Sequence, residues 1–134
     1  MIVRERARFA INDKSDVVSA RKEVVSAALA LGMSTMKEAQ LRTAVTELLT
    51  NMMRYAGGGY LLLEQLEHDR LKGIRAVFED SGPGIVDVPA ALSQGFSTGN
   101  SLGHGLSGCK KLVDSFELES SVGKGTKVVI TKWC

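Results

Sequence analysis

The spacing of the apolar residues changes several times along this chain, and the order of these changes limits the folds that it can form. Residues 3–11 alternate arginines with small or apolar side chains over much of their length, which predicts a strand. Apolar residues at helical spacing follow at 16–31 and 35–55, so the strand leads into two consecutive amphipathic helices. A capping box formed by Thr35 and Glu38 is expected to start the second of them.

The remainder of the chain is dominated by strand-like segments. Residues 60–66 and 74–79 predict one hairpin, and residues 115–121 and 126–133 predict another. Helical spacing returns between the hairpins at 105–114. The order of one strand, two helices, a hairpin, a helix and a hairpin predicts an α/β fold of the α+β type. We expect a two-layer sandwich, with a mostly antiparallel, mixed sheet and helices packed on one face.

The composition is that of one ordinary globular domain. A chain of 134 residues fits a single domain spanning 1–134, and its net charge of +2 is too small to indicate a nucleic-acid partner. Cys109 and Cys134 lack the spacing of a disulfide framework or a metal site, which favours a reducing compartment. Because no apolar run is long enough to cross a bilayer, we expect a cytoplasmic protein without a membrane partner.

Glu47 and Asn51 are a candidate pair of functional side chains on the second expected helix. Residues four apart lie about 40° apart around a helix axis and one turn apart along it, so both side chains point into one site. Their neighbours Leu48 and Met52 are apolar, which places the pair at the edge of a core-facing surface, where polar groups need partners. Taken alone, the pair is better explained by an exposed Glu with a polar neighbour, which is common on helices.

The segment Asp80-Ser81-Gly82-Pro83-Gly84 follows directly on an expected strand. Its two glycines allow a sharp turn and a close approach to a flat ligand. An ionised Asp80 only accepts hydrogen bonds, so it would pair with the exocyclic amine of adenine and be repelled by the carbonyl oxygen of guanine. A plain turn after the strand is the alternative interpretation of this segment.

Two further glycine-rich segments could contact phosphates or serve only as connections. Residues 80–104 form a long irregular stretch, which is typical of a functional lid. At its end Gly103, Gly105 and Gly108 precede or open a helix, whose N-terminal N–H groups and dipole suit phosphate. Residues 122–125, before Thr126, are consistent with a simple hairpin turn.

Taken together and in this order, these motifs resemble the ordered set of the GHKL ATPases, whose ATP-binding domain has the Bergerat fold. The N-box is Glu47-Leu-Leu-Thr-Asn51, the two glycine boxes are residues 80–84 and 103–108, and Thr126 completes the set. Within this superfamily the chain most resembles the RsbT-type switch serine kinases of the anti-sigma regulatory family. That likeness is carried by Tyr55-Ala-Gly57, by Phe78-Glu-Asp80-Ser-Gly-Pro-Gly-Ile85, by Gly95-Phe-Ser-Thr98 and by Thr131-Lys-Trp133.

The resemblance assigns a role to each motif residue. It implies that Asn51 binds Mg through its amide oxygen, that Asp80 recognises adenine, and that Thr126 supports adenine through a water molecule. It implies that Glu47 is the general base that accepts a proton from a serine or threonine hydroxyl as this attacks the γ-phosphorus of ATP. Gly82 and Gly84 would flank the base and the ribose, and the glycine-rich ATP lid with Gly103, Gly105 and Gly108 would wrap the triphosphate.

The resemblance also implies partners and leaves one main alternative. The substrate would be a STAS-domain antagonist in a stressosome-like assembly, and its phosphorylation would release the kinase to activate a downstream partner such as a PP2C-type phosphatase. A sensor histidine kinase is disfavoured because neither His68 nor His104 lies on a preceding dimerisation helix. The main alternative is an ATP-dependent binding module of the anti-sigma type, which sequesters its partner with little catalysis.

Overall fold

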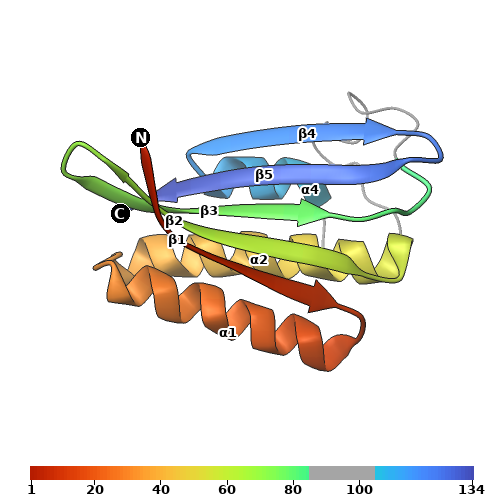
Figure 1. Cartoon of the computed structure of the whole chain (residues 1–134), viewed down its shortest axis with the longest axis horizontal. Helices are drawn as coiled ribbons and strands as arrows, with labels where there is room; N and C mark the ends of the chain where they lie inside the picture. Colours follow the sequence, from red (N-terminus) through yellow and green to blue (C-terminus); the bar gives the residue numbers. More distant parts are fainter. Residues whose placement is uncertain (85–104) are drawn as a thin grey trace.

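The structure, a computed structural model, describes residues 1–84 and 105–134 and has two layers (Figure 1). Of the predicted lid at 80–104, residues 85–104 lie outside the described residues; these include residues 95–98, Gly103 and His104. Within the described residues the chain forms three helices and five strands: β1 (Ile2–Ile11), α1 (Lys14–Ala30), α2 (Thr35–Ala56), β2 (Gly59–His68), β3 (Leu71–Glu79), α4 (Gly105–Leu112), β4 (Ser115–Ser121) and β5 (Gly125–Trp133).

The five strands form one antiparallel sheet in the order β1-β2-β3-β5-β4. The predicted two-layer α+β fold is therefore confirmed, and each strand pair that the structure describes is antiparallel. Helices α1, α2 and α4 lie on the same face of the sheet, which we call the inner face (Figure 1). The opposite face is called the outer face below.

The first two helices begin and end at residues whose local chemistry favours a helix terminus. Asp13 caps α1 by accepting a hydrogen bond from the Asp16 N–H at 2.9 Å. The N-cap of α2 is Ser34, whose hydroxyl oxygen accepts from the Lys37 N–H at 3.2 Å. The predicted capping box at Thr35 is therefore wrong by one residue. Helix α2 ends at Gly57, which has a left-handed φ of 73°.

The middle hairpin is longer than its sequence pattern predicts. The strand partners continue to His68 opposite Leu71, which leaves Asp69 and Arg70 as a two-residue turn. Asp69 has a φ of 56°, a conformation that aspartate tolerates better than most residues do. Residues 67–68 and 71–73, which lie outside the predicted strand bounds, are therefore paired strand.

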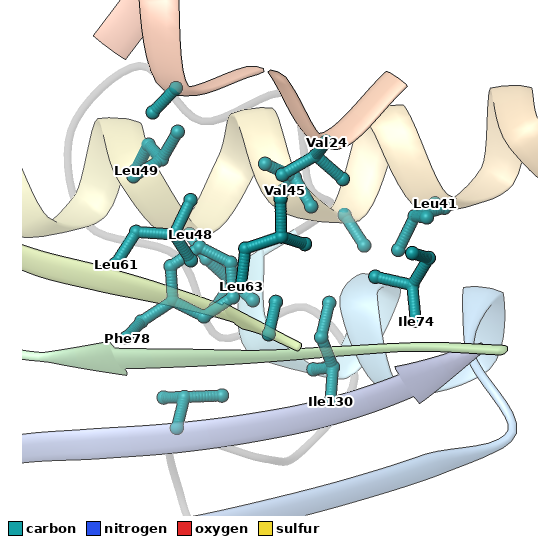
Figure 2. Close-up of a cluster of buried hydrophobic side chains, with 14 of the residues drawn as sticks. Val24, Leu41, Val45, Leu48, Leu49, Leu61, Leu63, Ile74, Phe78 and Ile130 are labelled. Carbon is teal, nitrogen blue, oxygen red and sulfur yellow. The ribbon is translucent and has the colours of Figure 1, made fainter. Parts of the chain in front are cut away.

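The core fills the space between the helices and the inner face (Figure 2). Apolar residues at helical spacing on α1 and α2, such as Val24, Val45 and Leu49, pack against Leu61 and Ile130 of the sheet (Figure 2). The largest fully buried side chains of the core are those of Ile11, Val24, Leu41, Val45, Leu49, Leu61, Ile74, Cys109 and Ile130. This core fixes α2 relative to the ends of β3 and β5.

A buried lysine joins the two layers. Lys132 of β5 lies opposite Ile74 and is buried on the inner face. Its Nζ donates hydrogen bonds to Gln40 Oε1 of α2 at 2.8 Å and to the Leu112 carbonyl oxygen at 2.7 Å. The second bond satisfies a carbonyl in the last turn of α4, where a cation is favoured by the helix dipole. Lys132 therefore holds the end of α4 next to α2.

Candidate functional site

Helix α2 carries Glu47 and Asn51 one turn apart, and both side chains are half-buried. Leu48, Leu49 and Met52 beside them are buried in the core. The two polar residues therefore lie at the margin of the core-facing surface, as the sequence predicts, and not on the fully exposed side of the helix. Half-burial leaves them accessible to a ligand while limiting their rotamers.

The surroundings of Cys109, a residue of α4, show that Glu47 of α2 lies near α4. The Cys109 thiol is buried and makes a weak hydrogen bond from Sγ to the Ala44 carbonyl oxygen of α2 at 3.7 Å. Burial, followed by the negative charge of Glu47, raises the pKa of the Cys109 thiol to about 12. The Glu47 carboxylate thus acts on α4 across the α2–α4 contact, although the two residues are 62 positions apart in sequence.

Asp80 directly follows β3 and joins the end of this strand to the start of β5. Its N–H donates to the Thr126 carbonyl oxygen at 3.0 Å, and its Oδ1 accepts from the Thr126 N–H at 3.2 Å and from the Gly82 N–H at 2.9 Å. Among the described residues, none donates a hydrogen bond to the second oxygen, Oδ2. The backbone therefore fixes the orientation of a carboxylate whose other oxygen is available to a ligand.

The glycines of residues 80–84 are needed for close packing. A Cβ atom at Gly82 would lie 2.6 Å from the Cβ of Ala56, in the last turn of α2. Gly84 has a φ of 78°, and a Cβ there would collide with the Ser121 carbonyl oxygen at the end of β4. These two glycines let the segment after β3 contact α2 on one side and the β4–β5 turn on the other.

Thr126 is held with its hydroxyl group next to Ser120. Ser120 Oγ donates to the Gly125 carbonyl oxygen at 3.1 Å and lies 3.0 Å from Thr126 Oγ1. Either hydroxyl can be the donor in this second pair, and in both cases the Thr126 oxygen keeps a lone pair that can accept from water. This arrangement suits the water-mediated role predicted for Thr126.

The segment that the sequence predicts to bind phosphate is described only in part. Gly105 is the first residue of α4 and Gly108 lies in its first turn, so the predicted helix start is found at the expected place. The helix ends at Leu112, two residues before the predicted end, because Asp114 donates its N–H to the Thr131 carbonyl oxygen beside β5. Lys110 and Lys111, in the last turn of α4, are exposed.

Three supporting residues were not predicted from the sequence. Gly125 has a φ of 98°, and a Cβ there would collide with the carbonyl oxygen of Asp80. Ser120 orients Thr126, and Cys109 joins α4 to α2 near Glu47. The glycine before Thr126 could have been noticed in the sequence. The contacts of these three residues could not, because they depend on which segments the fold brings together.

The donor chemistry of the site fits magnesium held mainly by a nucleotide. In the part of the chain that the structure describes, no group of three or more histidine, cysteine, aspartate or glutamate residues could hold a metal ion. Magnesium commonly binds through one or two protein oxygens, waters and substrate phosphates, so a dedicated cage is not required. The half-buried amide of Asn51 offers one such oxygen.

The arrangement of α2, the end of β3 and the start of α4 defines a nucleotide-binding domain, and the comparisons with known proteins identify its class. Residues 36–133 match the family described as histidine kinase-, DNA gyrase B- and HSP90-like ATPases. The chain belongs to this family, the GHKL ATPases.

More specific relatives lie within the same family. The chain is 42% identical over 118 residues to the serine/threonine-protein kinase RsbT of Bacillus subtilis (strain 168), covering 88% of this chain and 89% of that protein. It is 33% identical over 127 residues to the anti-sigma F factor of Caldanaerobacter subterraneus subsp. tengcongensis, covering 90% of this chain and 87% of that protein. The predicted resemblance to the RsbT type is confirmed.

The fold itself is shared with a solved structure. The mycobacterial sensor histidine kinase MprB aligns with a TM-score of 0.56 and 18% identity, over 98% of this chain and 97% of that one. This likeness supports the fold alone. Among the helices that the structure describes, none has the length and apolar character required to span a membrane.

Proposed function

We propose that this chain is an ATP-dependent serine/threonine-protein kinase that phosphorylates a STAS-domain antagonist in a partner-switching pathway. The kinase class follows from its family and from its 42% identity to a protein named as a serine/threonine kinase. The structural observation that carries the site assignment is the orientation of Asp80 by the Gly82 and Thr126 N–H groups.

Asp80 is suited to select adenine. Two backbone N–H groups bind Oδ1, so the carboxylate cannot rotate freely. In our proposal Oδ2 accepts a hydrogen bond from the exocyclic amine of adenine, and Thr126 binds the water molecule beside it. Guanine presents a carbonyl oxygen at that position, which the carboxylate would repel.

The triphosphate is proposed to extend from Asp80 toward the first turn of α4. Free N–H groups and the positive end of the helix dipole favour phosphate there, with Gly105 and Gly108 in the first turn. The Gly82–Ala56 contact keeps the adenine end close to α2, and the Cys109–Ala44 contact keeps α4 close to α2. Asn51 would hold magnesium, which supplies electrostatic stabilisation of the phosphate oxygens when it is bound.

Glu47 is the proposed general base. It lies one turn from Asn51 on the same face of α2, near α4. The hydroxyl oxygen of the acceptor serine or threonine would form a bond to the γ-phosphorus while the bond from this phosphorus to the β–γ bridging oxygen breaks. ADP leaves with that electron pair, and the hydroxyl proton passes to a carboxylate oxygen of Glu47.

The proposed partners follow the chemistry of the named relatives. A protein related to both a serine/threonine kinase and an anti-sigma factor is expected to bind a STAS-domain antagonist as its substrate. Phosphorylation of this antagonist within a stressosome-like assembly would release the kinase. The released kinase would then activate a downstream effector, such as a PP2C-type phosphatase, in the cytoplasm.

A second candidate function is supported by the 33% identical relative named anti-sigma F factor. In this alternative the domain binds its partner in an ATP-dependent manner, sequesters it, and catalyses little. Both functions need Asp80 for nucleotide binding, but only the kinase needs Glu47 as a base. A variant that lacks the Glu47 carboxylate therefore distinguishes the kinase from the binding module.

The kinase proposal is tested by phosphate transfer from γ-labelled ATP and magnesium to STAS-domain proteins encoded in the same genome. We expect label on one serine or threonine of one such protein, lost when that acceptor residue is changed to alanine. Transfer should also be lost with Glu47→Gln, while ATP binding is kept. ATP binding by the wild type without transfer to any candidate would contradict the kinase proposal and favour the binding module.

A further inference from the structure

The segment Thr131-Lys132-Trp133 of β5 carries part of the likeness to the switch kinases, yet the proposed site uses none of its residues. Each of the three forms a hydrogen bond at the C-terminal end of α4. The Thr131 carbonyl oxygen accepts from the Asp114 N–H at 2.9 Å, and the Trp133 N–H donates to Asp114 Oδ2 at 2.7 Å. Lys132 Nζ donates to the Leu112 carbonyl oxygen at 2.7 Å. The segment therefore attaches this end of α4 to β5.

Helix α4 is short, so its position depends on such attachments. With eight residues it is about 12 Å long, and an isolated helix of this length is unstable in water. It packs mainly on α2, where Cys109 Sγ contacts the Ala44 carbonyl oxygen at 3.7 Å. The contact at Cys109 holds the middle of the helix, and the bond from Lys132 to Leu112 holds its last turn. Two points held along one helix set its direction.

Lys132 is a buried cation without a carboxylate partner in the described part of the chain. The residue is 7% exposed, and none of the ion pairs within residues 1–84 and 105–134 includes it. Its Nζ bonds instead to two uncharged oxygens, Gln40 Oε1 at 2.8 Å and the Leu112 carbonyl oxygen. Because a buried ammonium group that loses a hydrogen-bond partner is strongly disfavoured, Lys132 favours the arrangement in which the end of α4 stays beside it.

We propose that Lys132 is a positioning residue for the triphosphate of ATP and that it acts through α4. This inference rests on the ATP site of the proposed function, in which phosphates bind the N–H groups in the first turn of α4. The bond at Leu112 sets the direction of the helix and so places these N–H groups at its other end. The helix dipole joins the two ends as well, since it favours a cation at the C-terminal end and an anion at the N-terminal end.

The adenine end of the site does not share this dependence. Asp80 is oriented by the N–H groups of Gly82 and Thr126, and neither residue belongs to α4. Loss of the Lys132 bonds should therefore weaken the binding of the phosphates and leave the binding of adenine and ribose unchanged. A residue that served only the stability of the core would weaken neither in the folded protein.

Two ligands test this difference: ATP with magnesium, and adenosine, which has no phosphate. NMR titration of isotope-labelled protein measures both dissociation constants. Lys132→Met keeps much of the side-chain volume and removes the ammonium group. It should raise the dissociation constant of ATP by about 10-fold, as expected if α4 is correctly placed in about a tenth of the variant molecules. The dissociation constant of adenosine should change by less than about 2-fold.

Lys111→Met is the matched control for charge. Lys111 lies in the last turn of α4 and is exposed, so this variant removes the same charge from the same end of the helix without removing a Lys132 bond. Its dissociation constant for ATP should stay within about 2-fold of the wild-type value, because exposed charges are screened by salt.

Gln40→Leu is a second, milder variant. It keeps the charge of Lys132 and removes one of its two bonds, so it should raise the dissociation constant of ATP by about 3-fold and leave that of adenosine unchanged. Circular dichroism shows whether each variant is folded. If Lys132→Met does not fold, the prediction for Gln40→Leu decides, and a wild-type affinity for ATP in that variant would overturn the inference.

Three results with folded Lys132→Met would also overturn it. These are a wild-type affinity for ATP, an equal loss of affinity for ATP and adenosine, and an equal loss of ATP affinity in Lys111→Met. A wild type that does not bind ATP would contradict the proposed nucleotide site, and this inference with it. Binding of ATP without phosphate transfer would contradict the kinase proposal alone.

Discussion

At the scale of single residues, the account depends on the two oxygens of Asp80 having different tasks. One oxygen is bound by backbone N–H groups, and the other is proposed to meet adenine. The sequence pattern predicted this aspartate. It also predicted Gly82 and Gly84 as residues beside the base and the ribose, and that role stays a prediction. The structure adds a packing reason for both glycines, because α2 and the β4–β5 turn come close to them.

Asp80→Asn separates these tasks. The amide oxygen can still accept from the Gly82 and Thr126 N–H groups, but the amide NH₂ would face the adenine amine, donor against donor. We expect ATP affinity to fall by about 2 kcal/mol, or about 30-fold, with little change in thermal stability. Calorimetric titration with ATP measures the first quantity, and thermal unfolding measures the second. An unchanged ATP affinity would contradict the role proposed for Asp80.

At the scale of elements, the types of helix and strand were predictable, and their exact limits were less so. Strong apolar periodicity predicted α1, α2 and the hairpins. The cap of α2 was predicted at Thr35 because Thr35 and Glu38 have the spacing of a capping box. Ser34 suits an N-cap equally well, and only the backbone conformation distinguishes it from Thr35. The contacts of α4 with α2 and β5 could not be predicted, since they join segments distant in sequence.

The corrected cap gives a matched pair of variants. Ser34→Ala removes the side-chain acceptor of the Lys37 N–H and should lower the free energy of unfolding by about 1 kcal/mol. Thr35→Ala removes no capping bond and should change it by less than about 0.5 kcal/mol. Urea denaturation of both variants measures the difference. A larger loss in the free energy of unfolding for Thr35→Ala than for Ser34→Ala would support the cap predicted from the sequence.

The packing of α4 on α2 should protect the Cys109 thiol. Its pKa of about 12 leaves about one thiolate in 10⁴ at pH 8, and the side chain is buried. In a Cys134→Ser background we expect iodoacetamide to label Cys109 at least about 100-fold more slowly than a free thiol. Urea at unfolding concentrations should remove this protection. Rapid labelling of the folded protein would show that α4 leaves α2 readily.

At the scale of the whole molecule, the two faces of the sheet have different roles. The inner face carries the core and orients the nucleotide site, and the outer face carries an ion-paired, partly apolar surface. The bonds from Arg75 and Arg6 hold the pKa of Glu64 below its ordinary value of 4.5. This group therefore contributes stability above about pH 4.5, and the contribution is lost as the pH falls through its lower folded-state pKa.

Glu64→Gln should remove this contribution. Arg6 is 61% exposed and Arg75 is 29% exposed, so water compensates part of the loss. We expect the free energy of unfolding to fall by about 1–2 kcal/mol at pH 7. Breaking a fully buried ion pair typically costs more, about 3–5 kcal/mol. Because the variant lacks the titrating group, its stability should fall less steeply below pH 4.5. Denaturation curves from pH 7 to pH 3 measure both effects, and identical curves would contradict this role.

The central claim is that the residue that recognises the nucleotide and the residue that removes the proton lie on different elements. Asp80 follows β3, and Glu47 lies on α2. Single-turnover phosphate transfer to the STAS-domain acceptor, measured against ATP concentration, tests it most directly. Asp80→Asn should need about 30-fold more ATP but approach the wild-type rate at saturation. Glu47→Gln should bind ATP as the wild type does and transfer about 10²- to 10⁴-fold more slowly at every concentration. A Glu47→Gln enzyme with the wild-type rate, or an Asp80→Asn enzyme whose saturated rate falls without loss of affinity, would contradict the account.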